Sequence, residues 1–271
     1  MLVKAGYEGF MAAQRNMGAL AEVVENISNS NFLGFKKNRT TFVEALNGEV
    51  LKYQARDFSQ GVLRKTNEPY DLALKGPGFF EVELPSGQRA YTRSGRFKLN
   101  GEGELVTDEG YKVIPQVENS GESTGPVFVS NGESELGLDI KVTAPKLIVP
   151  ISLTTEIRED GTINGVNEET GEKTKIGKIN IVSFNNPQGL ESLGKSVFVP
   201  TPSSGTPREI EVGPDVATKV QQGFLEFGNV SIATEFFNLS NLKNIITAQL
   251  KALKVIDKVY ENLHYTISRS T

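Results

Sequence analysis

Apolar residues recur at intervals of seven near both ends of this chain, and this spacing limits the possible folds more than any other feature. Near the C-terminus a second apolar set fills the three- and four-residue steps, and together the two sets comprise Ile232, Phe236, Leu239, Leu242, Ile246, Leu250, Leu253, Ile256, Tyr260, Leu263 and Ile267. Near the N-terminus the matching residues are Val3, Phe10, Met17, Leu20, Val24 and Ile27. This period is typical of one face of a supercoiled helix. The sequence therefore predicts two long terminal helices that pair as a coiled coil, with each other or with copies of themselves.

The same stripes have a simpler explanation, because an apolar stripe at helical spacing is more often part of an ordinary intramolecular core. Two observations count against it. The repeat is nearer to 3.5 than to 3.6 over about five heptads, which is the coiled-coil period. The stripes also lie at the chain ends, where a globular domain more often frays. We therefore treat both stripes as candidate interfaces between subunits.

The limits of the two helices can be read from neighbouring residues. The first should run from Leu2 to Ile27, with three glycines that each weaken a helix by about 1 kcal/mol relative to alanine. Such a helix would be marginal alone, and the Asn-, Ser- and Gly-rich stretch after it should end it. The last helix should begin after Ser231, a good N-cap residue, with Glu235 in its first turn.

Between the helices the apolar period changes to two, which predicts an antiparallel β-rich body. From Phe80 to Leu84 apolar residues alternate with Glu81 and Glu83, so we expect these two glutamates on a solvated face. Residues 85–88 and 100–103 have the composition of hairpin turns, and Asp160-Gly161 marks another. The predicted fold class is α+β, with long N- and C-terminal helices around a central β-rich body.

The predicted domains follow from these boundaries. Residues 1–35 and 228–271 form a terminal helical core domain for assembly, and 36–68 an extended connector. Residues 69–227 form a β-rich outer body. Within it, the Ser-, Gly- and Glu-rich stretch near 118–137 predicts an exposed excursion.

Composition excludes several classes of function. The chain has 271 residues, 29 Lys and Arg, and 33 Asp and Glu, with no basic run of the kind that binds nucleic acid. No apolar stretch approaches the ~20 residues of a membrane helix, and the start lacks the apolar region of a secretory signal. With no cysteine, there is no thiolate nucleophile and no disulfide. We expect no nucleic-acid partner, no membrane insertion and no cofactor.

Two features could suggest a catalytic or metal site. His264 is the single histidine, and it lies in the last helix without a neighbouring nucleophile or carboxylate, so a surface or interface position is favoured. Residues Asp160–Gly165 faintly resemble a calcium loop, but the alternating acidic ligands and closing Glu of that motif are missing. A hairpin turn explains them better.

Glycine-rich and paired acidic positions are equally weak signals. Gly76-Pro77-Gly78 is too short to cradle phosphate, and a bend between strands explains it. The pairs Glu81/Glu83 and Glu168/Glu169 fall on a predicted solvated face and in a predicted loop. We expect no catalytic residue and no metal site.

Seven blocks of residues match a known pattern in order. The first contains Asn26, Asn29, Gly34, Phe35 and Lys36, which fit the signature Asn-Asn-Leu/Ile-Ala-Asn followed by Gly-Phe-Lys, although Glu25 replaces its first Asn and Phe32 a usual Thr. The other blocks are 58–61, 70–80, 91–97, 103–107, 189–194 and 222–226. With these blocks the chain resembles the rod and hook family of axial proteins of the bacterial flagellum. Its length and the block 189–194 are most similar to distal rod members.

The resemblance implies a structural subunit that self-assembles into a helical tube and transmits torque from motor to hook. Its terminal helices would pack in concentric layers and be disordered before assembly. The whole chain would cross the flagellar type III export apparatus unfolded, without a cleaved signal peptide. It implies a homo-oligomer that also contacts other rod and hook subunits and envelope ring or bushing proteins. The expected location is the basal body outside the cytoplasmic membrane, spanning the periplasm where the host has an outer membrane.

Two alternatives remain open at this stage. The connector 36–68 is shorter than distal rod members commonly have, and the excursion near 118–137 departs from their pattern, so a proximal rod or hook subunit is one alternative. The other is a monomeric β-rich binding module or enzyme whose helices fold back on its own core. Truncation of the last helix separates that second reading from a polymer-forming subunit.

Overall fold

The computed structural model describes residues 2–44, 50–116, 147–150, 153–167 and 170–270. The predicted excursion near 118–137 and the pair Glu168/Glu169 lie outside these residues. Contacts divide the chain into two units, which are described separately below. The first unit is Met1–Asn31, Lys36–Asp57 and Asn229–Thr271, and the second is Phe32–Phe35 and Phe58–Gly228.

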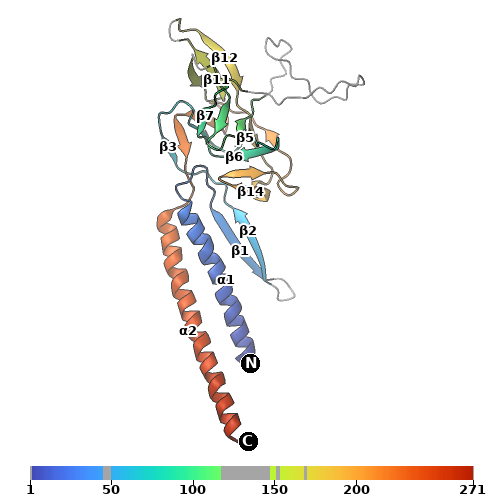
Figure 1. Cartoon of the computed structure of the whole chain (residues 1–271), viewed down its shortest axis with the longest axis vertical. Helices are drawn as coiled ribbons and strands as arrows, with labels where there is room; N and C mark the ends of the chain where they lie inside the picture. The colour runs from blue at the N-terminus through green and yellow to red at the C-terminus, as the bar shows by residue number, and fades with distance from the viewer. Residues whose placement is uncertain (1, 45–49, 117–146, 151–152, 168–169, 271) are drawn as a thin grey trace, which may run out of the picture. The chain divides into compact units, whose positions relative to one another are not determined.

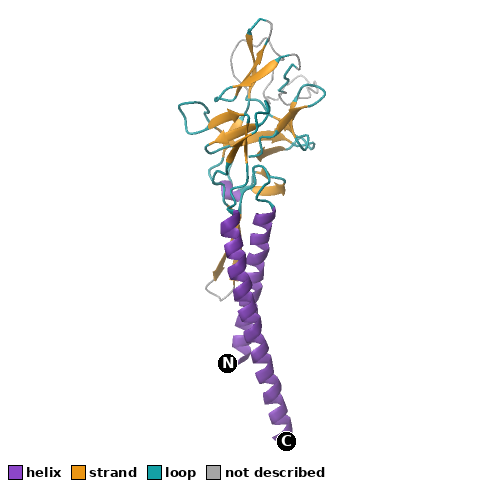
Figure 2. Cartoon of the chain, turned by 90° about the vertical axis from the view of Figure 1, so that its left-hand side faces the viewer, coloured by secondary structure: helices purple, strands orange, loops and turns teal. Residues whose placement is uncertain are grey.

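The first unit consists of two long helices and one hairpin. Helix α1 (Leu2–Ser28) and helix α2 (Ile232–Ser270) lie side by side in both views (Figures 1 and 2). Strands β1 (Asn38–Glu44) and β2 (Val50–Arg56) pair antiparallel, and β1 also contacts α1. The predicted terminal helices are confirmed, and α2 begins directly after Ser231. The β1–β2 hairpin lies within the predicted connector 36–68, whose role as a separate domain stays a prediction.

Two glycines of α1 lie against large apolar side chains of α2. A Cβ atom built on Gly9 would lie 3.4 Å from Cδ2 of Leu253, and one on Gly6 would lie 3.9 Å from Cγ2 of Ile256. Two turns further along α1, the side-chain amide of Asn16 donates to Oε1 of Gln249 at 3.0 Å. The glycines that weaken α1 as an isolated helix thus face large apolar side chains of α2, at distances where a Cβ would make ordinary van der Waals contact.

The second unit is an antiparallel β body. Its strands are β3 (Leu63–Lys65), β4 (Leu72–Lys75), β5 (Phe79–Glu83), β6 (Arg89–Thr92), β7 (Phe97–Leu99), β8 (Leu105–Thr107), β9 (Lys112–Val113), β10 (Thr154–Ile157), β11 (Thr162–Val166), β12 (Lys173–Lys178), β13 (Ile181–Ser183), β14 (Glu191–Gly194), β15 (Val197–Val199), β16 (Arg208–Glu209), β17 (Lys219–Gln222) and β18 (Phe224–Glu226). A nine-stranded sheet runs β14-β15-β6-β5-β9-β8-β7, with β13 pairing β5 and β16. Strands β10, β11 and β12 form a three-stranded sheet, while β17 pairs β4 and β18 pairs β3. The predicted antiparallel body is confirmed.

The turns predicted from sequence join neighbouring strands. Residues 85–88 connect β5 to β6, residues 100–103 connect β7 to β8, and Asp160-Gly161 connects β10 to β11. Gly161 has φ of 82° and its N–H donates to the carbonyl of Arg158 at 2.9 Å, closing the turn. Asp160-Gly161 is therefore a hairpin turn, as the sequence indicated.

Strand β5 is buried on both faces. Phe80 and Val82 belong to the larger apolar cluster, which also includes Leu72, Ile163 and Val220. Phe79 points to the opposite face, into an aromatic cluster with Tyr91, Phe184 and Phe198, against which Phe58 packs edge-to-face. Alternation along β5 therefore places residues in one core or the other, instead of one core and water.

Candidate functional site

Glu81 corrects one expectation from the sequence, because its side chain is buried rather than solvated. It lies on the same face of β5 as Phe79, and the aromatic cluster covers that face. Its carboxylate accepts hydrogen bonds from Arg89 at 2.9 Å and from the hydroxyl of Tyr91 at 3.3 Å, and a further one from the side-chain amide of Asn180. Through these hydrogen bonds, Glu81 links β5 to β6 and to Asn180, which directly precedes β13.

The same contacts change the ionisation of Tyr91. Burial raises the pKa of its phenol most, and the charge of Glu81 and the hydrogen bond to it raise the pKa further, while Arg89 lowers it. A tyrosine buried beside a carboxylate strongly disfavours the phenolate form.

This shift predicts a loss of stability at high pH. In the unfolded chain Tyr91 ionises from about pH 10, whereas in the folded body its pKa is raised, so stability is complete below that pH and declines as the pH rises above it. The slope that this one group adds approaches about 1.4 kcal/mol per pH unit. Urea unfolding of wild type and Tyr91→Phe between pH 9 and 11 should show a shallower decline for the variant, and parallel declines would contradict the shift.

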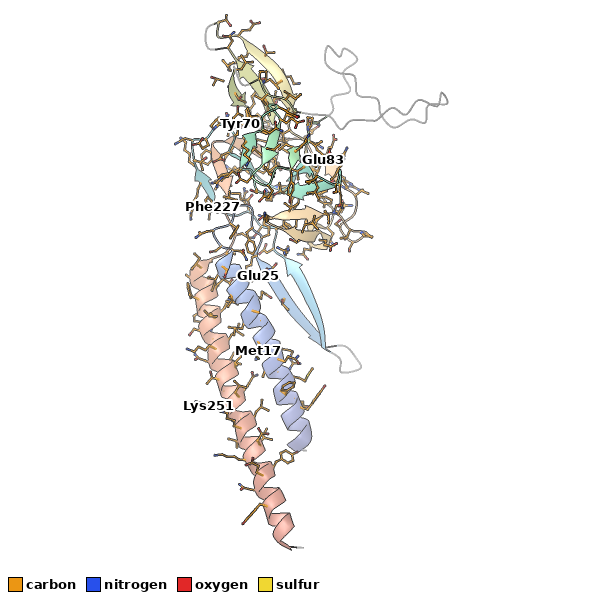
Figure 3. The ribbon with its side chains drawn as sticks, viewed as in Figure 1. Met17, Glu25, Tyr70, Glu83, Phe227 and Lys251 are labelled. Carbon is orange, nitrogen blue, oxygen red and sulfur yellow. The ribbon has the colours of Figure 1, made fainter. Side chains whose placement is uncertain are left out.

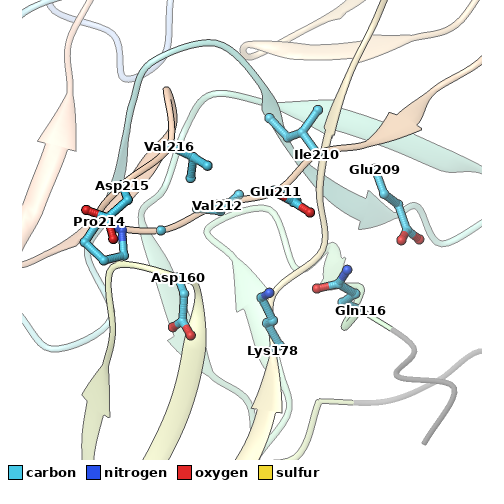
Figure 4. Close-up of a pocket in the computed structure, with 11 residues that line it drawn as sticks. Gln116, Asp160, Lys178, Glu209, Ile210, Glu211, Val212, Pro214, Asp215 and Val216 are labelled. Atoms are coloured by element: carbon cyan, nitrogen blue, oxygen red, sulfur yellow. The ribbon is translucent and has the colours of Figure 1, made fainter.

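An open hollow in the β body is acidic but has no arrangement of catalytic groups (Figure 4). It has a volume of about 570 Å³ and is lined by Asp160, Glu209, Glu211 and Asp215 around Lys178, together with Ile210 and Val216. Burial would raise the pKa of Asp160, but the hydrogen bonds from Thr162 and nearby Lys178 and Arg158 hold it below its usual value. In the described part of the chain, His, Cys, Asp and Glu form no group suited to hold a metal ion.

The remaining chemical candidates have structural roles or lie outside the described side chains. Gly76 and Gly78 have φ of 115° and 126° at the bend between β4 and β5, where a Cβ on Gly76 would lie 2.2 Å from the carbonyl oxygen of Ala217. Thr218 donates to the carbonyl of Pro77 there. His264 lies in α2, but its side chain is not among those described. Neither described helix has the length and hydropathy needed to span a bilayer.

The predicted stripe on α1 divides between two faces. Phe10, Met17 and Val24 are exposed, with Phe10 and Met17 each 58% accessible, and Figure 3 marks Met17. Leu20 and Ile27 are half-buried, and the side chain of Val3 is not among those described. The residues buried on α1 are Ala13, Val23 and Asn26. The exposed set keeps the seven-residue spacing, so α1 presents these three apolar side chains in a line along one face, which we call the exposed strip.

The predicted stripe on α2 divides in the same way. Half-buried positions are Leu239, Leu242, Ile246, Leu253 and Ile256, and exposed positions are Ile232, Phe236, Leu250 and Tyr260. Leu263 and Ile267 are not among the described side chains. The sequence analysis missed a further exposed apolar set, which comprises Phe237, Ile245, Val255, Val259 and Tyr265. The steps of eight from Phe237 to Ile245 and of four from Val255 to Val259, both of which return to one side of a helix, were the available signal.

Two asparagine side chains, Asn26 of the first matched block and Asn229, hold the base of the β1–β2 hairpin. Asn26 is fully buried, donating to the carbonyl of Asn38 at 3.0 Å and accepting from its N–H at 2.9 Å. Asn229 likewise accepts from the N–H of Lys37 at 2.8 Å and donates to the carbonyl of Asp57 at 2.7 Å. The two amides therefore act as substitute strand partners. Lys37 also pairs with Glu235 in the first turn of α2.

Other residues of the first block close α1 and enter the second unit. Asn29 donates to the carbonyl of Glu25 at 2.8 Å at the end of the helix. Gly34 has φ of 64°, and its N–H donates to the carbonyl of Glu226 at 2.8 Å. Phe35 and Lys36 are buried. The structure thus places the first matched block at the end of α1 and directly after it.

Glu226 and Arg93 form a buried ion pair that the sequence analysis did not identify. Both side chains are at most 3% exposed, and Nη1 of Arg93 lies 3.3 Å from Oε2 of Glu226. Oε1 of Glu226 accepts the N–H of Gly61 at 2.7 Å, and Nη2 of Arg93 donates to the carbonyl of Gly76 at 2.8 Å. Each of these residues belongs to a different matched block, and that was the signal available in the sequence.

In comparisons with known proteins, the chain is similar to flagellar rod and hook proteins. The family pattern of the flagellar hook protein FlgE/F/G D1 domain matches residues 73–165, within the β body. The flagellar basal-body rod protein FlgG of Borreliella burgdorferi is 30% identical over 275 residues, which cover 93% of this chain and 92% of that protein. FlgG of Buchnera aphidicola subsp. Schizaphis graminum is 29% identical over 279 residues, covering 94% and 95%. FlgG of Bacillus subtilis is 26% identical over 286 residues, covering 97% and 98%.

Proposed function

The chain belongs to the flagellar basal-body rod and hook family, and on that premise we propose that it polymerises through its two terminal helices into the helical tube of the distal rod. It is a structural rod subunit, most like the FlgG proteins. The similarity runs over nearly the whole of both chains, which supports the FlgG type over other members of the family. Torque transmission from motor to hook is the mechanical role of such a tube.

The observation that carries the polymer proposal is the exposed apolar strip on each helix. Phe10, Met17 and Val24 on α1 and Ile245, Val255 and Val259 on α2 are exposed in the single chain. Large contiguous apolar surfaces on soluble proteins mark interaction sites. Strips on different elements of one chain suit a heterologous contact, which does not close on itself and so extends into a filament.

The pairing of α1 with α2 as a coiled coil is the finer part of the proposal. The seven-residue spacing and the packing of Leu253 and Ile256 over Gly9 and Gly6 support it. The half-buried members of the predicted stripes would form the seam within one chain, and the exposed members would contact neighbouring copies. Coverage of these exposed strips would order the helices on polymerisation, because an isolated helix with glycines is marginal.

Partners and location follow from the same proposal. The tube would contact other rod and hook subunits along its axis and envelope ring or bushing proteins around it. It would stand in the basal body outside the cytoplasmic membrane, reached through the flagellar type III export apparatus. The matched relatives are rod proteins, and the buried carboxylates Glu81 and Glu226 hold parts of the β body together, so we propose no catalytic activity, no cofactor and no nucleic-acid partner for this chain.

Met17→Asp tests the polymer proposal at the exposed strip of α1. In a tube, the change would remove the burial of one methionine and place a carboxylate against apolar side chains, which together cost at least about 3 kcal/mol per contact. The critical concentration for polymerisation should rise at least about 100-fold. Because Met17 is exposed in the single chain, its melting temperature should change by less than about 2 °C.

Met17→Leu is the matched control, because it keeps an apolar side chain and a good helix former at the same position. It should polymerise at nearly the wild-type concentration. Sedimentation and electron microscopy measure the tubes, and calorimetry measures the melting temperature. Normal tubes from Met17→Asp would refute the assignment of this strip to a subunit contact.

A further inference from the structure

The polypeptide passes between the two units four times. The passages follow Asn31, Phe35, Asp57 and Gly228. In the second unit, the segments beside these passages are short: residues 32–35, 58–62 and 226–228. Any load on the helices of the first unit that travels along the chain must enter the β body through these three segments. How the three are joined to one another therefore decides how the body carries load.

The three segments are hydrogen-bonded directly to each other. Leu33 forms an antiparallel bridge with Phe227, which Figure 3 marks, and the N–H of Gly34 donates to the carbonyl of Glu226 at 2.8 Å. The N–H of Phe227 donates to the carbonyl of Val62 at 2.9 Å. Residues 226–228 thus lie between the other two segments and bond to both.

A buried charge strengthens this junction. The carboxylate of Glu226 accepts a hydrogen bond from the N–H of Gly61. Arg93, directly after β6, balances the charge of this carboxylate and donates to the carbonyl of Gly76. Burying two charges is expensive, and such pairs are weak sources of net stability. They do fix geometry, because each partner must be satisfied by specific groups in specific places.

A second contact holds the segment 32–35. The turn between β14 and β15 contains Lys195 and Ser196 with φ of 48° and 60°, which is unfavourable for residues other than glycine. Oγ of Ser196 donates to the carbonyl of Leu33 at 2.8 Å, and Thr92 donates to the carbonyl of Ser196 at 2.9 Å. Backbone strain of this kind persists where surrounding contacts impose it.

We propose that Glu226 and Arg93 are positioning residues that join segments 32–35, 58–62 and 226–228 into one anchor, through which load on the helices enters the β body. The inference rests on the proposed rod function for the source of the load. Its physical basis is that hydrogen-bonded neighbouring segments share an applied force, so their bonds must break together. Segments without such bonds would separate from the β body one at a time. On this proposal, the residues of several matched blocks meet in the anchor because they carry load, and not because they form a catalytic site.

The test variant is Arg93→Met with Glu226→Met in the full chain. Replacing a buried ion pair by apolar side chains of similar volume is often neutral for stability, so this variant is expected to fold. Gly61 loses its acceptor directly, and Gly34, whose N–H donates to the backbone carbonyl of Glu226, loses the contacts that hold this residue in place. Both amides should therefore exchange at least about tenfold faster. The control is Glu81→Met with Arg89→Met, which removes another buried carboxylate of the body, and there those two amides should exchange at the wild-type rate.

Ser196→Gly is the second variant, since it removes the contact to Leu33, keeps the backbone conformation accessible and touches no charge. It should accelerate exchange at Gly34 and leave Gly61 unchanged. If neither variant changes exchange at these amides, the anchor does not exist. The amide exchange experiment uses the unpolymerised chain, so its result does not depend on whether the chain forms tubes.

Tubes of each variant then test the mechanical role. Arg93→Met with Glu226→Met should form tubes at the wild-type concentration, with a torsional stiffness at most about half that of wild type. Glu81→Met with Arg89→Met should form tubes of wild-type stiffness. Equal stiffness in all three would overturn the anchor as a load path. Failure of the wild-type chain itself to form tubes would instead overturn the proposed function.

Discussion

Deletion of Leu250–Thr271 is expected to abolish polymerisation while the β body remains folded. The deletion removes Leu253 and Ile256, which pack over the glycines of α1, and it removes the exposed Val255 and Val259. Both the pairing of α1 with α2 and the outer strip of α2 would be shortened. The β body contains its own two apolar clusters, all of whose members belong to the second unit, so its unfolding should be unaffected.

Electron microscopy should show no tubes at any concentration at which the full chain forms them. Thermal unfolding of the β body, followed by the near-ultraviolet signal of its buried aromatic side chains, should keep the wild-type midpoint within about 2 °C. Lys251→Ala is the control, because it alters an exposed side chain in the same stretch and leaves both apolar faces intact. Unfolding of the whole chain on truncation would instead favour a self-contained monomeric protein, the alternative of another class.

Gly34→Ala is expected to cause the largest loss of stability of any single change considered for this chain. A Cβ atom at this position would lie 2.4 Å from the amide nitrogen of Ser94 and 2.6 Å from the carbonyl carbon of Arg93. Both are backbone atoms of a buried segment and cannot rotate away. The residue also has φ of 64°, which costs alanine about 1 kcal/mol before any collision. The total loss should exceed about 3 kcal/mol in the free energy of unfolding of the β body.

Gly87→Ala separates the two contributions. Gly87 has φ of 81° in the turn between β5 and β6, and a Cβ built there meets nothing within 4 Å. Its loss should therefore be about 1 kcal/mol, from the backbone conformation alone. Urea unfolding of the three proteins, with equal dependence on denaturant, measures the difference. Similar losses for the two variants would show that segment 32–35 does not pack against Arg93 and Ser94 as described.

The local elements of this protein could be predicted from its sequence. The limits of α1 follow from apolar spacing and from the Asn-, Ser- and Gly-rich stretch after it, and the start of α2 follows from Ser231. The turns at 85–88, 100–103 and Asp160-Gly161 follow from residues that tolerate tight or left-handed backbone. Such features depend on neighbours within a few positions along the chain, and those neighbours are visible in the sequence.

Features that depend on distant segments could not be predicted in this way. Alternation along β5 indicated one buried and one solvated face. The second face is instead covered by the aromatic cluster that includes Phe184 and Phe198, and Glu81 on that face is buried. The sequence predicted apolar stripes on both helices, but spacing does not show which members are half-buried and which remain exposed. A pattern along one element reports that a face is apolar, and it carries no information on what lies against that face.

The sequence by itself determined the helices at the chain ends, the antiparallel strands between them and the family to which the blocks point. Only the tertiary structure showed that Gly34, Gly61 and Arg93 meet at Glu226, up to 192 positions away, with Gly61 and Arg93 on its buried carboxylate and Gly34 on its backbone carbonyl. The physical reason is that periodicity and turn chemistry are local properties of the chain. The burial of a charge, in contrast, is decided by whichever distant residues folding brings around it.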